Sequence, residues 1–186
     1  TAFGHIFHKY GAKLSSLDVA PTAENLKKAA IYIIVDPDNA KENPNPNYVG
    51  GKDIKAITDW VKAGGVLLLM ANDSGNCDLD HFNKLADAFG ITFTNKSRNM
   101  VKNDEFGTGV VIPNNKLVFK EPYKMYLKEI SVMKVKTPAK ALVTKEDDIV
   151  IATAKYGKGT VFAVGDPWLY NEYVDGRKLP VEYPNH

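Results

Sequence analysis

The sequence predicts a single α/β domain in three layers, with helices on both faces of a mixed, mostly parallel β-sheet. Three observations lead to this fold class. Short, continuous apolar runs at 31–35 and 66–70 are typical of buried parallel strands. The segment between them has the apolar spacing of an amphipathic helix. Two further runs, 149–156 and 160–164, are joined by a Gly-Lys-Gly turn, which predicts an antiparallel hairpin near the C-terminus.

The first thirty residues carry shorter patterns. Apolar residues recur at helical spacing from Phe3 to Tyr10, and Gly11 suits the position that follows the end of a helix. We therefore expect a short amphipathic helix here. The segment 12–14 is expected to form a brief strand, and 21–29 a short helical turn that a proline opens.

The residues from 31 to 70 have the pattern of a βαβ unit. The run 31–35 is β-branched and continuous, which is typical of a central parallel strand. The segment 36–48 holds three prolines and four asparagines and is expected to be a long loop. A helix over 52–63, with a buried stripe that includes Ile57, would then cross over to the next strand at 66–70.

The second half of the chain alternates between clear and weak patterns. Asp78 is a candidate N-cap for a helix over 79–89, and a short strand is expected at 91–93. Glycines, a proline and asparagines interrupt the region 95–123, which we interpret as an irregular excursion. The remaining strands are expected at 109–112, 117–119, 127–135 and 139–144.

Composition excludes several classes of protein. The 186 residues carry a formal charge of +2 from 24 basic and 22 acidic residues spread along the chain, so no nucleic-acid partner is expected. No apolar run is long enough for a membrane span. The single cysteine, Cys77, excludes an internal disulfide framework and a cysteine-rich metal site. His5 and His8 have no third metal ligand nearby, and Gly64-Gly65 precedes a strand rather than following one, so neither a metal nor another cofactor is expected.

The ends of the chain suggest a longer parent protein. Thr1 is an unusual first residue, and His186 follows Pro184-Asn185 without a closing element. We therefore expect the single domain 1–186 to be part of a longer polypeptide.

Polar side chains follow three of the predicted strands at the point where each strand ends. The first strand runs into Asp36-Pro37-Asp38, the second into Asn72-Asp73 and the last into Asp166-Pro167. In open parallel sheets, ligands bind outside the carboxyl ends of the strands. We therefore expect Asp36, Asp38, Asn72, Asp73 and Asp166 to lie at one ligand-binding edge.

These carboxylates have more than one possible use. A pair of them could act as general acid and base on a glycosidic bond, which makes Asp36, Asp73 and Asp166 the candidates for catalysis. They could instead hold a hard cation such as calcium. They could also be turn signals whose carboxylates accept hydrogen bonds from backbone amides. The residues alone leave the three uses open.

An aromatic loop follows the last predicted strand. Trp168 and Tyr170, with Glu172 and Arg177 close by, could form a sugar-stacking platform with hydrogen-bonding neighbours. The same residues could pack over the sheet edge or form an interface with another part of a longer chain. We include these four residues in the predicted ligand-binding set.

A catalytic nucleophile is not expected. The turn after Met70 contains neither Gly-x-Ser-x-Gly nor Gly-x-Cys-x-Gly. Ser74 and Cys77 lie three and six residues past the predicted end of the strand, so neither occupies the sharp elbow where a nucleophile is presented. A structural turn in which Asn72 and Asp73 bond local backbone amides is the preferred interpretation.

Five segments together resemble a known family. They are the stretches 33–38, 60–66, 70–73, 128–130 and 157–173, of which the last, GKGTVFAVGDPWLYNEY, is the most specific. This combination resembles the extra domain of some bacterial unsaturated rhamnogalacturonyl hydrolases, which degrade pectin and carry an (α/α)6 barrel. The extra domain is itself similar to class I glutamine amidotransferases and other flavodoxin-like domains, so the resemblance implies that fold.

The resemblance also implies a function and its limits. An amidotransferase needs a cysteine in the turn after Met70, where this chain has Ala71-Asn72-Asp73, and a late His-x-Glu pair, yet no histidine occurs between Val164 and His186. The resemblance therefore implies a non-catalytic accessory domain that binds saccharide or docks on the hydrolase barrel. The alternative is a carboxylate-dependent hydrolase of unsaturated rhamnogalacturonan oligosaccharides. The family implies a periplasmic or secreted location.

Overall fold

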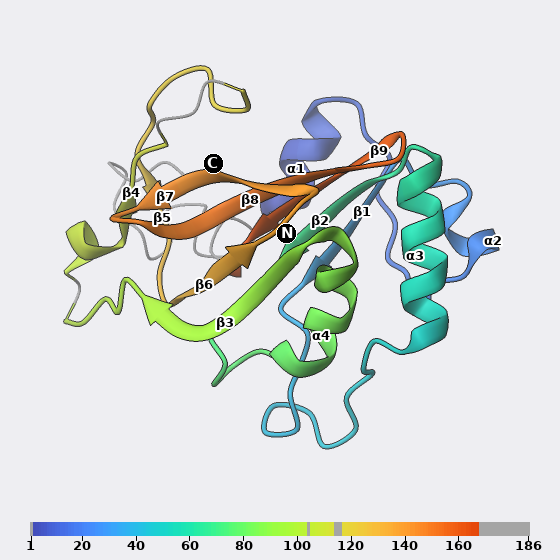
Figure 1. Cartoon of the computed structure of the whole chain (residues 1–186), viewed down its shortest axis with the longest axis horizontal. Coiled ribbons are helices and arrows are strands. Elements are labelled where there is room, and N and C mark those ends of the chain that lie inside the picture. The colour runs from blue at the N-terminus through green and yellow to red at the C-terminus, as the bar shows by residue number, and fades with distance from the viewer. Residues whose placement is uncertain (1, 104, 114–116, 168–186) are drawn as a thin grey trace.

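The computed structural model describes residues 2–103, 105–113 and 117–167, and its centre is a seven-stranded sheet (Figure 1). The strand order is β1-β2-β9-β8-β6-β3, and β7 pairs with β8. The strands are β1 (Ile31–Val35), β2 (Val66–Met70), β3 (Ile91–Arg98), β6 (Ile130–Val135), β7 (Ala139–Lys145), β8 (Asp148–Tyr156) and β9 (Gly159–Val164).

Most of the strands point the same way. β1, β2 and β9 are mutually parallel neighbours, whereas the pairs β9–β8, β8–β6, β8–β7 and β6–β3 are antiparallel. It follows that β1, β2, β6, β7 and β9 share one direction and that β3 and β8 oppose it. The predicted mixed α/β sheet and its antiparallel hairpin, β8–β9, are confirmed.

Three helices cover one face of the sheet. They are α2 (Ala23–Leu26), α3 (Gly51–Ala63) and α4 (Leu79–Ala86), which continues into a 3-10 turn at Asp87–Phe89. α3 buries Ile57 and Val61, as its sequence stripe predicts, and the backbone N–H of Gly50 donates to the Asp53 carboxylate at 2.8 Å to begin the helix. The predicted N-cap Asp78 accepts a hydrogen bond from the first turn of α4, and Thr22, which was not predicted as a cap, does the same for α2.

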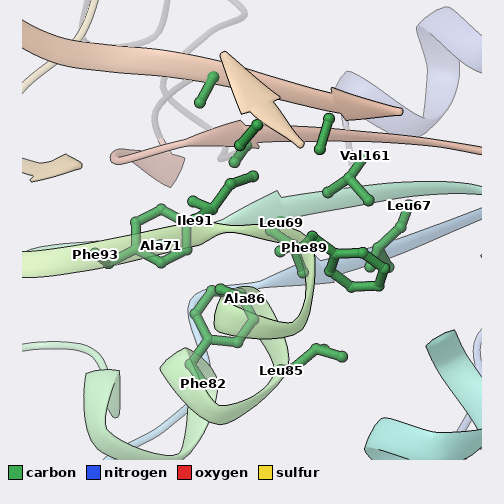
Figure 2. Packing of buried hydrophobic residues seen from close by; sticks show 14 of the residues in the cluster. Leu67, Leu69, Ala71, Phe82, Leu85, Ala86, Phe89, Ile91, Phe93 and Val161 are labelled. Atoms are coloured by element: carbon green, nitrogen blue, oxygen red, sulfur yellow. The ribbon is translucent and has the colours of Figure 1, made fainter. Parts of the chain in front are cut away.

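Aromatic side chains fill the space between α4 and the sheet (Figure 2). Phe82 of α4 stacks on Phe93 of β3 with ring centroids 5.4 Å apart, and both are buried. Phe89 meets Tyr156 of β8 edge to face at 5.1 Å. Leu67 and Leu69 of β2 complete this core from the sheet side. Burial of such side chains away from water is the main source of stability for the layer.

A second apolar cluster lies on the opposite face. Its sheet residues include Met70, Val150 and Val164, and Phe3 of α1 (Ala2–Lys9) packs against it. A small two-stranded sheet, β4 (Val110–Val111) with β5 (Met125–Tyr126), adds to the cover. Helices therefore cover both faces, and the three predicted layers are present (Figure 1).

Two predictions in the first part of the chain are wrong. The segment 12–14 is not a strand: Leu14 is 52% exposed, and the backbone N–H of Ala12 donates to Phe7 O of α1 rather than to a neighbouring strand. Within the described part of the chain β1 is an edge strand rather than a central one, because β2 is the only strand there that pairs with it. A continuous apolar run reports that both faces of a strand are covered, and it does not report how many strands adjoin it.

The irregular region 95–123 is also shorter than predicted, and its strands lie at partly different positions. β3 continues to Arg98, five residues past its predicted end. β4 pairs with β5 at Met125–Tyr126, and the predicted strand 117–119 has no strand structure in the described residues 117–119. β5 has only two residues, so it carries no period-2 pattern that could identify it in the sequence.

Candidate functional site

The carboxyl ends of β1, β2 and β9 meet at one edge of the sheet, as the sequence predicts. The strand ladder extends past the strands there, because Asp36 N donates to Met70 O at 2.8 Å and Ala71 N donates to Val164 O at 3.0 Å. The loops that start at Asp36, Ala71 and Gly165 are therefore neighbours. The loop after β1 lies at the lower edge of the molecule in Figure 1.

Asp36 combines an unusual backbone conformation with a buried carboxylate oxygen. Its backbone φ is 46°, in the left-handed region that a non-glycine residue rarely adopts. Its Oδ2 accepts a hydrogen bond from Asn72 Nδ2 at 3.1 Å. Its Oδ1 is buried and has no hydrogen-bond partner among the described residues. An unsatisfied buried oxygen is uncommon in native structures and points to a special role for the residue.

The surroundings of Asp36 favour its protonated form. The pKa of this carboxyl is raised from 3.8 to about 6, chiefly by burial and with a contribution from the negative charges of Glu42, Asp38 and Asp73, while the Asn72 hydrogen bond opposes the rise. Asp36 therefore changes its charge close to neutral pH.

Asn72 and Asp73 form a structural turn after β2. Asp73 Oδ1 accepts from Gly75 N at 2.8 Å, and its Oδ2 accepts from Asn76 Nδ2 at 2.6 Å. Asn72 Oδ1 accepts from Asp73 N at 2.8 Å. The preferred interpretation of this turn is therefore correct: both oxygens of the Asp73 carboxylate are engaged locally.

Besides the Asn72–Asp36 hydrogen bond, two more join the loop after β1 to the loop after β2. Asn39 Nδ2 donates to Gly75 O at 3.0 Å, and Asp78 N donates to Pro37 O at 2.8 Å. The exposed Asp38 takes no part in this connection; its Oδ2 accepts from Asn43 within its own loop at 3.0 Å. The two loops are thus held as one unit, with Asp36 and Asn72 at its base.

Asp166 lies in a different environment from Asp36. It is fully buried, and its Oδ2 accepts a hydrogen bond from the backbone N–H of Lys128, in the segment that leads to β6. Gly165 is tied to β6 itself, because its carbonyl accepts from Ser131 N at 2.8 Å. The structure therefore places Asp166 toward β6, whereas Asp36, Asn72 and Asp73 interact with one another.

The environment of Cys77 disfavours nucleophilic chemistry. The side chain is 2% exposed. The pKa of its thiol is raised to about 12, chiefly by burial, which outweighs a backbone hydrogen bond from Asn72, and with a smaller contribution from the charges of Asp36 and Asp78. Because the thiolate is the reactive form, this cysteine is inert at neutral pH.

The sequence analysis did not predict a ligand site at three residues of this edge, Tyr48, Asp78 and His81. The ring of Tyr48 stacks on His81 with centroids 4.1 Å apart and planes 16° apart. His81 Nδ1 lies 3.1 and 3.0 Å from the two carboxylate oxygens of Asp78. The only sequence signal was the N-cap pattern at Asp78, which accounts for the helix start but not for the aromatic stack.

The other predicted ligand residues lie outside the described residues: Trp168, Tyr170, Glu172 and Arg177. Among the residues that the structure describes, no group of three or more His, Cys, Asp or Glu side chains could hold a metal ion. In the same part of the chain, no helix is long and apolar enough to cross a membrane. A hollow of about 450 Å³ is lined by His8, Gly11, Ala12, Lys13 and Leu14, next to α1 and apart from the carboxyl ends of the strands.

Comparison with known proteins identifies the fold but not a family. No family model matches the chain, and no curated protein matches it. The N-terminal domain of mmIFT52 has a TM-score of 0.72 at 17% identity, over 92% of this chain and 81% of its own length. A cytoplasmic protein from Salmonella typhimurium, STM3548, has a TM-score of 0.62 at 14% identity, over 89% of this chain and 74% of its own.

A glycoside hydrolase also contains this fold. The exo-β-1,4-mannosidase Op5Man5 from Opitutaceae bacterium strain TAV5 has a TM-score of 0.54 at 17% identity. The match covers 88% of this chain but 25% of the mannosidase. At these identities the likeness shows the α/β fold alone.

Proposed function

We propose that this chain is a non-catalytic α/β module of a carbohydrate-degrading system, which binds saccharide or docks on a glycoside hydrolase catalytic domain. One observation carries the proposal: at the edge where a ligand is expected, two of the three candidate carboxylates serve as structural acceptors. Asp73 accepts from Gly75 N and Asn76, and Asp166 accepts from Lys128 N. Because both carboxylates hold backbone or side-chain groups of the fold in place, this weighs against either as the partner of Asp36 in acid–base catalysis.

The occurrence of the fold within a glycoside hydrolase supports the proposal. In the mannosidase, the matching region is a quarter of a longer chain, which is the arrangement expected of an accessory domain. The sequence resemblance narrows the proposal to a pectin-degrading system, in which the partner would be the hydrolase barrel. Carbohydrate or that barrel is then the partner to test.

A second candidate function keeps one observation in its favour. The pKa of Asp36, about 6, lies in the range of a general acid that works near neutral pH. A carboxylate-dependent hydrolase would also need a second carboxylate about 5 to 9.5 Å from the first. Of the other predicted catalytic carboxylates, Asp73 is the one whose charge contributes to the raised pKa of Asp36, but its two oxygens already accept hydrogen bonds.

Three measurements on the purified chain test the proposal. Calorimetric titration with oligosaccharides from rhamnogalacturonan and from neutral polysaccharides tests saccharide binding. Sedimentation velocity with a separately produced rhamnogalacturonyl hydrolase barrel tests docking. An assay of unsaturated rhamnogalacturonan hydrolysis tests the alternative.

The proposal expects binding or docking, and no hydrolysis by the chain alone. Hydrolysis that Asp36→Asn abolishes would replace it with the second candidate. The absence of binding, docking and hydrolysis together would overturn both.

A further inference from the structure

We propose that Tyr48 and His81 form a subsite for an uncharged pyranose ring at the carboxyl ends of β1 and β2. The inference rests on the saccharide binding proposed above. It adds two things to that proposal: the residues that contact the sugar, and the charge class of the sugar.

The first argument is the stack itself. Tyr48 ends the loop after β1, and His81 lies in the first turn of α4, so two separate elements bring the rings to 4.1 Å. Tyr48 remains 42% exposed although His81 covers one face of its ring. The exposed part of the tyrosine therefore lies outside the stack. A flat aromatic face with a hydroxyl at its rim suits the apolar C–H face of a pyranose and its flanking hydroxyls.

The second argument is the orientation of the imidazole. A carboxylate accepts hydrogen bonds but cannot donate them, so the nitrogen that faces Asp78, Nδ1, carries the proton. In neutral His81 the other nitrogen, Nε2, is then an acceptor. The histidine side chain is 33% exposed. A sugar hydroxyl beside the Tyr48 ring could donate to this nitrogen.

Asp78 is itself held in place, so the imidazole is preorganised. The Asp78 side chain is 10% exposed, and its Oδ1 caps the first turn of α4 by accepting from His81 N at 3.4 Å. Its backbone N–H donates to Pro37 O at 2.8 Å. Fixing side chains before the ligand arrives lowers the entropy that binding must offset.

The third argument is charge, and it selects the class of saccharide. The two segments that build this edge, 36–48 and 71–81, contain six carboxylates and a single cationic residue, Lys41. A uronate would approach this concentration of negative charge against electrostatic repulsion, whereas a neutral hexose would not. The carboxylates are Asp36, Asp38, Glu42, Asp73, Asp78 and Asp80.

The test is a titration of the full chain with matched neutral and acidic trisaccharides. Mannotriose and galactotriose are the neutral probes, and trigalacturonate is the acidic one; calorimetry or chemical-shift mapping at neutral pH and low salt gives each Kd. We expect the neutral probes to bind at least about tenfold more tightly than trigalacturonate, a difference of about 1.4 kcal/mol. Raising the salt concentration should narrow the gap, because it screens the carboxylates.

Variants locate the binding. Tyr48→Ala should weaken the neutral probes by about tenfold or more, and Tyr48→Phe, which keeps the ring, should retain most of the affinity. His81→Ala should weaken them by a smaller factor. Tyr10→Ala is the matched control, because Tyr10 is 85% exposed on the other side of the sheet, after α1. Thermal unfolding of each variant checks that the fold is intact.

Several outcomes would overturn the inference. Equal or tighter binding of trigalacturonate would overturn the charge argument, and undiminished binding by folded Tyr48→Ala would overturn the location. If no saccharide binds at all, the inference fails, while the proposed module function still stands if the chain docks on a catalytic domain. The two proposals therefore fail on different measurements.

Discussion

Asn72 Nδ2 donates a hydrogen bond to Asp36 Oδ2 at 3.1 Å and so links the loop after β1 to the loop after β2. The other carboxylate oxygen, Oδ1, is buried without a hydrogen-bond partner among the described residues. The hydrogen bond favours the ionised carboxylate, and burial favours the protonated one. Burial is the larger effect, since the pKa rises to about 6. The protonation of Asp36 is thus set by a balance that substitutions can shift.

Removing the Asn72 amide should raise the pKa of Asp36 above about 6. The hydrogen bond is the contribution that lowers this pKa, so Asn72→Ala leaves burial and the neighbouring carboxylates acting alone. Titration of the Asp36 side-chain carboxyl carbon by NMR would measure the change. Asn76→Ala is the control, because its amide binds Asp73 rather than Asp36. A pKa that is unchanged or lower in Asn72→Ala would contradict this account of the balance.

The stability of the protein should fall as pH rises through the pKa of Asp36. The folded-state pKa, about 6, lies above the ordinary value of 3.8, so the folded state binds the proton more tightly. The contribution of the Asp36 proton to folding stability is fully present below about pH 4 and is lost as pH rises through about 6. The shift corresponds to about 3 kcal/mol at full burial, and we expect about 1 to 2 kcal/mol after solvent screening of a partly exposed carboxyl.

Asp36→Asn tests this pH dependence. The variant has no carboxyl to ionise at this position. Between about pH 4 and 7, the free energy of unfolding should decrease in both proteins, but the decrease should be about 1 to 2 kcal/mol smaller in Asp36→Asn than in the wild type. Urea unfolding across that range gives the measurement. Asp80→Asn, which removes an exposed carboxyl from the same edge, controls for the loss of one charge. Identical pH profiles for wild type and Asp36→Asn would count against a raised pKa.

The sequence could predict that the loops after β1, β2 and β9 meet at the carboxyl ends of the strands, because the signals for each strand end are local. An apolar run that ends in Asp-Pro or Asn-Asp gives both the strand and its end, and the structure confirms that the loops after β1, β2 and β9 adjoin. The interpretation of the turn at Asn72 and Asp73 was correct for the same reason, since both residues bond to neighbours in the chain.

What the sequence could not predict depends on contacts between distant segments. The Asp166 carboxylate is oriented by its hydrogen bond from Lys128 N, which is 38 positions away in the chain. The stack of Tyr48 on His81 depends on how a long loop folds against α4. Neither leaves a periodic pattern. The edge position of β1 was missed because an apolar run records coverage of the faces and not the number of neighbouring strands.

The side chain of Asn83 pairs with the backbone of β3, the last strand in the sheet order, as a neighbouring strand would. Its removal should therefore lower the stability of the protein. Its Nδ2 donates to Phe93 O at 2.9 Å and its Oδ1 accepts from Phe93 N at 2.8 Å, so one side chain pairs both backbone groups of a residue on β3. Asn83→Ala leaves both groups without that partner, and we expect a loss of about 2 to 3 kcal/mol in the free energy of unfolding.

Urea unfolding would measure this loss, with Lys84→Ala as the control. Lys84 is the next residue of α4 and is exposed, so its substitution should change stability by less than about 0.5 kcal/mol. A loss in Asn83→Ala no larger than in Lys84→Ala would mean that water replaces the side-chain amide at this edge.

Gly165 should tolerate no side chain, because backbone atoms occupy the space around it. A Cβ at this position would lie 2.0 Å from Ser131 O and 2.7 Å from Ile130 Cγ2. The Gly165 carbonyl also accepts from Ser131 N at 2.8 Å, so moving the two segments apart would break the strand contact. We expect Gly165→Ala to lower the free energy of unfolding by more than about 3 kcal/mol.

The matched control is Gly107→Ala, where no atom lies within 4 Å of the added Cβ. It should change stability by less than about 1 kcal/mol. Gly165 directly precedes Asp166, so the same substitution should also displace the buried carboxylate from Lys128 N. The amide signal of Lys128 should therefore shift in any folded Gly165→Ala protein. Equal stability of the two alanine variants would show that the start of β6 can move away from Gly165 at little cost. The buried position of Asp166 would then not be fixed by this contact.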